Sequence, residues 1–203
     1  MPFSDFKSIE QVISAYPLEL VQTSFLPRRR LKLPSLFLAD LNFSLERQAA
    51  HESEIYFRES LISPFLRKAW QRHPRLKLWV NRNLRYDDRL SGEPDYFVAA
   101  DTAREITDRL VKRPLMAVAA AKREDFEEGW GQCLAGMIAC RELNAPETLT
   151  IYGVVSTGHT WQFGKLNGPV FTRDPLSYSI ADPQRVFGLL DFVFGECERQ
   201  LAN

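Results

Sequence analysis

The sequence lacks several features that would define a function class at once. It has only three cysteines, and none of them forms a CxxC pair, so neither a disulfide framework nor a cysteine zinc site is predicted. No apolar run approaches the roughly 18 residues of a membrane-spanning helix. The start of the chain has neither the basic segment nor the apolar run of a signal peptide, and no glycine-rich phosphate loop is present. These absences predict a cytoplasmic protein without a membrane segment.

Acidic residues are missing from one long window, although the net charge of the chain is zero. Between Ser60 and Tyr86 there is no Asp or Glu, and Lys and Arg alternate with Trp70 and Trp79. A basic segment with aromatic residues can contact phosphates and stack on bases. The alternative is a solvated face with both tryptophans in the core, which the overall neutrality favours. The candidate nucleic-acid-binding residues are Arg67, Arg72, Arg75, Lys77 and Arg82.

Hydrophobic periodicity predicts a mixed α/β (α+β) fold with a mixed central sheet flanked by helices. No repeat or low-complexity linker divides the chain, so we expect one domain over 1–203, with 1–50 as an N-terminal extension and 51–203 as the core. The segment 26–34, LPRRRLKLP, is expected to be a connector or edge strand with exposed arginines. Helices are expected over 8–16, 35–48, 51–71, 124–143 and 182–201, and strands over 76–80, 94–99, 115–122, 148–157 and 160–166.

Glu59 falls on the apolar stripe of the helix expected over 51–71. The stripe, with 4-3-4-3 spacing, consists of Ile55, Glu59, Ile62, Leu66 and Ala69. An unpaired carboxylate on such a stripe is unfavourable. Glu59 is therefore predicted to pair with a cation such as Arg58 or Lys122, or to face a metal. Pro64 is expected to kink the helix.

Three short segments share the pattern of a known nuclease superfamily. They are GEPDYFVA (92–99), MAVAAAKRE (116–124) and GWGQCLAGM (129–137). Together with the order of helices and strands, they resemble the PD-(D/E)XK nuclease superfamily, which has the restriction-endonuclease-like fold. The resemblance covers roughly 52–166 and extends to uncharacterised bacterial members, common in cyanobacteria. It implies that Asp95 is the metal-binding aspartate, Lys122 the motif lysine, Glu59 the acid of the first core helix, and Gln132 the glutamine of the exonuclease-like branch.

The sequence departs from this pattern at one position. Two residues before Lys122 the superfamily has Asp or Glu, and this chain has Ala120. Residues two apart share one face of a strand, so the substitution removes a carboxylate from the expected site. Mg²⁺ prefers oxygen ligands and usually takes one or two carboxylates together with water and phosphate. The resemblance leaves Asp95, Glu59 and the carbonyl of Ala121 as metal ligands. Migrated acids that could replace the missing one are Glu124, Asp125 and Glu128, which alternatively only enrich the first turn of a helix.

Three functions remain open at this stage. The first is a Mg²⁺-dependent DNA nuclease, which the loss at Ala120 makes degenerate or weak, so enzyme activity stays undecided. The second is a non-catalytic module that binds nucleic acid or a protein partner. The third is a plain assembly protein that forms a homodimer through its apolar strands. Ala120 favours the last two, and the basic window favours the first two.

Overall fold

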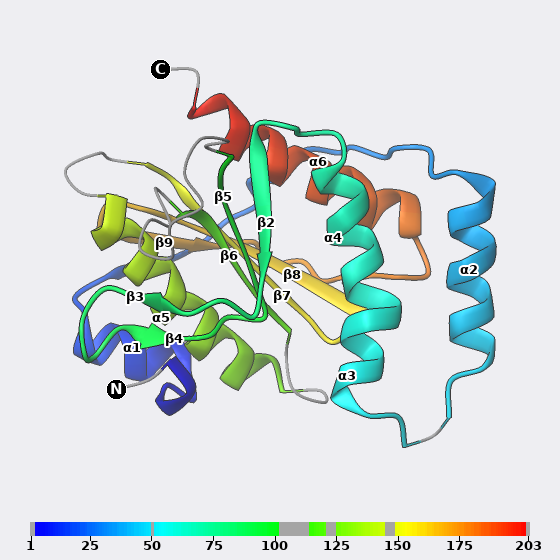
Figure 1. The fold of residues 1–203 in the computed structure, drawn as a ribbon. Helices are drawn as coiled ribbons and strands as arrows, with labels where there is room; N and C mark the ends of the chain where they lie inside the picture. The colour runs from blue at the N-terminus through cyan, green and yellow to red at the C-terminus, as the bar shows by residue number, and fades with distance from the viewer. Residues whose placement is uncertain (1–2, 50, 102–113, 121–124, 145–148, 202–203) are drawn as a thin grey trace.

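The structure is a computed structural model that describes residues 3–49, 51–101, 114–120, 125–144 and 149–201; for 114–120 it describes the backbone alone. Within these ranges no helix is both long and apolar enough to cross a membrane. The chain forms a mixed α/β fold, as the hydrophobic periodicity predicts. Figure 1 shows a twisted central sheet with helices on both sides.

The central sheet combines parallel and antiparallel pairs. β1 pairs with β9, and β6 with β7, in parallel, whereas the other neighbouring strands are antiparallel. β10 (Tyr178–Ser179) pairs with β8, and β3 (Leu84–Arg85) pairs with β4 (Ser91–Gly92) in a separate small sheet. The strands of the main sheet are, in spatial order, β1 (Glu19–Gln22), β9 (Val170–Arg173), β8 (Thr160–Asn167), β7 (Ile151–Ser156), β6 (Pro114–Ala120), β5 (Tyr96–Ala100) and β2 (Leu76–Val80).

Each face of the sheet has its own hydrophobic core. Strand β7 shows why: Ile151 and Val155 pack with the core beneath α5, whereas Tyr152 and Val154 pack with the core beneath α4 and α6. Successive side chains of a strand point to opposite faces, so one buried strand supplies both cores. The helices are α1 (Ile9–Ala15) and α5 (Phe126–Asn144) on one face, and α4 (Ser63–Trp70) and α6 (Pro183–Arg199) on the other, with α2 (Ser35–Glu46) outside α4.

The long helix expected over 51–71 is interrupted by a π-helical turn. It consists of α3 (Glu54–Phe57), the π-helical turn η2 (Arg58–Ile62) and α4. The N–H of Ser63 donates to the carbonyl of Arg58, five residues earlier. Pro64 follows directly, and because it has no N–H it cannot donate to the carbonyl four residues before it. A π-helical turn, in which the N–H bonds to the carbonyl five residues earlier, inserts one extra residue and so accommodates the missing hydrogen bond.

This π-helical turn corrects the predicted apolar stripe. Ile62, Leu66 and Ala69 are buried as expected, but Ile55 is 62% exposed and Glu59 is also exposed. The spacing argument assumed 3.6 residues per turn throughout. The wider turn rotates the residues before it relative to the stripe, so that Phe57 rather than Ile55 packs against the core. Glu59 therefore lies outside the apolar core of the helix.

The N-terminal residues pack closely on the rest of the chain. β1 joins the main sheet through β9, and the segment 23–34 crosses α6 without forming a strand. A Cβ atom at Gly188 of α6 would lie 2.5 Å from the carbonyl oxygen of Arg29, so the missing side chain permits this crossing.

We therefore expect Gly188→Ala to lower the free energy of unfolding by about 1–3 kcal/mol, the usual effect of overpacking. The added methyl meets backbone, which cannot rotate away. Chemical denaturation measures the change. Gly195→Ala in the same helix is the control, because its Cβ would meet only the His73 ring, at 3.3 Å. Equal stability of the two variants would contradict this account of the crossing.

Candidate functional site at the start of strand β5

The strand pairing brings the candidate site residues to one edge of the sheet. Tyr96 of β5 lies opposite Val118 of the antiparallel β6, so the start of β5 lies beside the end of β6. Ala120, at the end of β6, lies opposite Ser156 at the end of β7. This confirms that the strands expected over 94–99 and 115–122 are neighbours. Asp95 precedes β5 directly and stands at this edge.

Arg58 joins the two acidic candidates of this site. Its NH1 atom donates to Asp95 Oδ1 at 3.0 Å, and its Nε atom donates to Glu59 Oε1 at 3.3 Å. The side chains of Arg58 and Asp95 are 21% and 27% exposed, whereas that of Glu59 is 56% exposed. Partial burial lowers the pKa of Arg58, but the hydrogen bond and the charge of Asp95 outweigh it, so the pKa is raised overall. One guanidinium thus compensates part of the charge of the two carboxylates at this position.

Tyr96 of β5 also contacts Arg58. Its ring is buried, and its hydroxyl donates to the backbone carbonyl of Arg58 at 3.4 Å. Burial raises the pKa of Tyr96 to about 12, so the hydroxyl keeps its proton near neutral pH and remains a donor. The π-helical turn η2 and β5 are therefore linked through both the side chain and the backbone of Arg58.

Three candidates of the nuclease pattern, Lys122, Ala121 and Glu124, lie outside the described residues. The nuclease pattern implies that Asp95 and Lys122 lie in one site, and this stays a prediction. Ala120 is described through its backbone and its pairing with β7.

The remaining candidates surround the beginning of α5. Gln132 Nε2 donates to Glu128 Oε1 at 2.8 Å, and Lys7 Nζ approaches the same oxygen at 2.9 Å. Asp125 Oδ1 accepts the N–H of Glu128 at 3.0 Å. Asp125 thus acts as a helix cap. Glu128 and Gln132 connect α5 to the N-terminal segment.

The described carboxylates that were expected to bind Mg²⁺ are paired with an arginine. In the parts of the chain that the structure describes, no group of three or more His, Cys, Asp and Glu side chains is placed to hold a metal. Asp95 and Glu59, the two described candidates, both hydrogen-bond to Arg58. Mg²⁺ requires near-octahedral oxygen coordination and strong charge compensation. A cation would first have to displace the guanidinium.

The basic window divides into two groups in the structure. Arg72 Nε donates to Asp191 Oδ1 of α6 at 2.5 Å. Arg75 uses its backbone N–H to reach Glu198 Oε1 at 3.1 Å and its NH2 atom to reach the carbonyl of Leu201 at 2.8 Å. These two candidates therefore hold α6 and the residues that follow it, a role that the sequence analysis did not assign to them. Arg67 is exposed on α4.

The second group lies on β2, the edge strand of the sheet, and just after it: Lys77 is on the strand and Arg82 follows its end. Lys77 Nζ lies 5.0 Å from the ring centre of Trp70 and 5.9 Å from that of Trp79, and Arg82 Cζ lies 5.6 Å from that of Trp79. Both tryptophans are half-buried, so neither is a pure core residue. The N–H of Asn81 donates to the carbonyl of Asp95 at 3.0 Å. The chain just before Arg82 therefore lies beside the candidate site.

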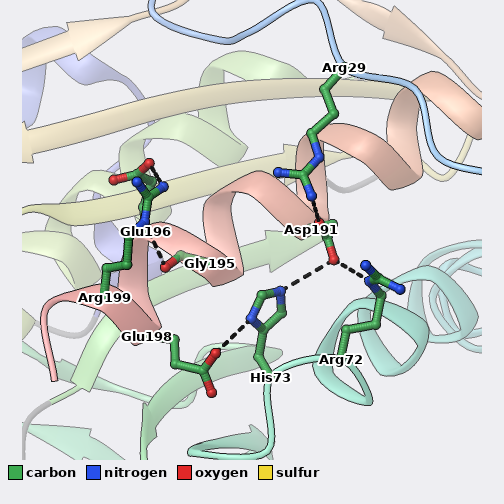
Figure 2. Close-up of polar contacts among 8 residues, drawn as sticks. All are labelled: Arg29, Arg72, His73, Asp191, Gly195, Glu196, Glu198 and Arg199. Carbon is green, nitrogen blue, oxygen red and sulfur yellow. Dashed lines mark hydrogen bonds and ion pairs between the residues drawn. The ribbon is translucent and has the colours of Figure 1, made fainter. Parts of the chain in front are cut away.

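Sequence reasoning missed a charged cluster around Asp191 (Figure 2). The side chain of Asp191 is 2% exposed and accepts hydrogen bonds from Arg29 and Arg72, both at 2.5 Å. His73 Nε2 lies 3.3 Å from Asp191 Oδ1, and His73 Nδ1 lies 3.0 Å from Glu198 Oε2. The arginines of segment 26–34 are thus not all free on the surface. The signal in the sequence was an acid inside the apolar run FGLLDFVFG.

The chain matches no model of a known protein family, and no curated protein matches it significantly. Its function is therefore inferred from residues and geometry.

Proposed function

We propose that this chain is a nucleic-acid-binding protein with the residue arrangement of a PD-(D/E)XK nuclease, and that it cuts DNA weakly or not at all. The observation that carries the proposal is the position of Arg58 between Asp95 and Glu59. A guanidinium compensates the charge of the carboxylates that a divalent cation would need. The superfamily has an acid at the position of Ala120, so this chain lacks a further carboxylate there.

The binding part of the proposal rests on the edge strand β2. Lys77 and Arg82 lie over the rings of Trp70 and Trp79, close to the chain that contacts Asp95. Cations held against aromatic rings suit a nucleic-acid strand, because the cations contact its phosphates. Arg67 adds charge on α4, whereas Arg72 and Arg75 are engaged with α6.

A homodimer is the second candidate, and one surface favours it. Leu36 and Phe43 of α2 are 72% and 62% exposed and stand seven residues apart, so they share one face of the helix. Exposed apolar side chains on one helix face are typical of association surfaces. Sedimentation in the absence of DNA distinguishes this function from nucleic-acid binding.

We expect the affinity for a fluorescent 30-nucleotide DNA strand, measured by anisotropy, to fall steeply with salt. Lys77→Gln with Arg82→Gln should weaken binding about tenfold or more and reduce the salt slope by about 0.7 for each lost phosphate contact. The matched control is Arg28→Gln with Lys32→Gln, which removes the same charge from exposed positions of segment 23–34. We expect the control to bind like the wild type.

Absence of binding at low salt, or an equal loss in both double variants, would contradict the binding part of the proposal. Rapid cleavage of DNA by the wild type with Mg²⁺ would contradict the proposal that the chain cuts DNA weakly or not at all. The same cleavage assay with Mn²⁺ in place of Mg²⁺ tests whether a second divalent cation supports cleavage.

A further inference from the structure

A half-buried arginine, Arg173, at the end of β9 has no acidic ion-pair partner among the described residues. Arg173 NH2 donates to Gln162 Oε1 at 2.7 Å, and its Cζ atom lies 5.6 Å from the ring centre of Trp130. Trp130 Nε1 donates to the same Gln162 oxygen at 2.7 Å. Gln162 in turn donates to Ser177 Oγ at 3.0 Å. Gln162 of β8, which also bonds to Ser177, and Trp130 of α5 therefore fix the position of the guanidinium.

The charge of Arg173 is poorly compensated within the described chain. Among the described residues no carboxylate lies within ion-pair distance of it, and Glu10 of α1 acts only through its charge. Burial lowers the pKa of Arg173 despite Glu10. A guanidinium has five N–H donors, of which the bond to Gln162 uses one. The remaining donors suit an oxyanion that accepts two hydrogen bonds side by side.

Arg173 stands toward the same edge of the sheet as Asp95. β8 is antiparallel to β7 and begins at the edge where β7 ends. The antiparallel β9 runs toward that edge and ends at Arg173, which lies opposite Gly164, four residues after the start of β8. Four strand spacings separate β5 from β9 in the sheet order, a distance of about 19 Å. Several nucleotides of an extended strand span such a distance.

We infer that Arg173, positioned by Gln162 and Trp130, binds a phosphate group of the nucleic-acid strand, several nucleotides away from the Asp95 position. This inference rests on the proposed function and adds a second contact point to it. A strand that runs along this end of the sheet would meet Arg82, which follows β2, and Arg173 at the end of β9. The phosphate supplies a negative charge next to Arg173, where no described carboxylate lies within ion-pair distance.

The test uses the full chain and the same 30-nucleotide DNA strand. Arg173→Gln should lower the affinity about tenfold and reduce the salt slope by about 0.7. Glu10→Gln should raise the affinity, because it removes the acid whose charge acts on Arg173. The matched control is Lys165→Gln, another half-buried cation over a ring, whose Nζ lies 5.0 Å from the ring centre of Phe25. Circular dichroism confirms that each variant is folded.

The outcomes separate this inference from the proposed function. If DNA binding falls in the Lys77→Gln/Arg82→Gln variant but not in Arg173→Gln, the inference is overturned and the proposed function stands. If the wild type does not bind DNA, the proposed function fails, and isothermal titration with inorganic pyrophosphate decides the inference. Pyrophosphate binding that Arg173→Gln removes supports a site for free phosphate groups. No pyrophosphate binding by the wild type overturns it.

Discussion

Replacement of Asp191 by asparagine is expected to lower the melting temperature by roughly 10 °C. The carboxylate is buried and accepts hydrogen bonds from Arg29 and Arg72. Removal of one partner from a buried ion pair costs about 3–5 kcal/mol. The two arginine side chains are 40% and 51% exposed, so water can solvate them again and the lower end of this range applies. A protein of this size loses about 2–4 °C for each kcal/mol.

The control for Asp191→Asn is Asp88→Asn. Asp88 pairs with Arg85 at 2.5 Å, but their side chains are 90% and 66% exposed, and exposed pairs contribute little to stability. We expect the melting temperature of this variant, measured by calorimetry, to stay within about 2 °C of the wild type. A shift below about 3 °C for Asp191→Asn would show that the cluster does not hold the fold together.

The Asp191 cluster also determines which variants can test DNA binding. Arg72 contributes both to the basic window and to the contact with α6. A substitution at Arg72 would therefore change stability as well as surface charge. Lys77 and Arg82 contact the rings of Trp70 of α4 and Trp79 of β2, so substitutions there test the surface more directly. This is why the proposed double variant leaves Arg72 and Arg75 intact.

Much of the fold could be predicted because its signals are local. The alternation of Leu76, Leu78 and Val80 indicates β2, and the apolar stripe of α5 is visible in the sequence. β1, β9 and β10 were not predicted. They are short, with bounds Glu19–Gln22, Val170–Arg173 and Tyr178–Ser179, and their existence depends on pairing between distant segments. Periodicity within one segment does not carry that information.

The site was less accessible from the sequence for two physical reasons. A π-helical turn changes the helical period, so the argument that placed Glu59 on the apolar face was wrong there. The pairing of Glu59 with Arg58 was one of its predicted outcomes and is confirmed. The approach of Arg58 to Asp95 depends on how the helix crosses the sheet, which no local pattern specifies. Asp191 left a visible signal, but its partners, Arg29 and the adjacent Arg72 and His73, come from two segments far from it in the sequence.

The double variant Arg58→Gln with Ala120→Glu is expected to bind Mn²⁺ at least about tenfold more tightly than the wild type, as measured by calorimetry. The first substitution releases Asp95 and Glu59 from the guanidinium. The second places a carboxylate at the end of β6, next to the start of β5. Negative charge compensates the lost hydration of a divalent cation, and Mn²⁺ accepts the same oxygen ligands as Mg²⁺. Neither single variant should reach this affinity. Ala120→Glu alone keeps the Arg58 guanidinium, and Arg58→Gln alone lacks the carboxylate at position 120.

The matched control for this metal test is Arg58→Gln with Ala120→Gln, which has the same size and geometry but lacks the added charge. We expect it to bind Mn²⁺ no better than Arg58→Gln alone, because an amide compensates less of the charge of a divalent cation than a carboxylate does. Equal binding by both double variants would show that the carboxylate at position 120 is not a ligand. Wild-type binding as tight as that of the Ala120→Glu double variant would show that Arg58 does not block the carboxylates. In that case the weak-nuclease account would lose its main physical reason.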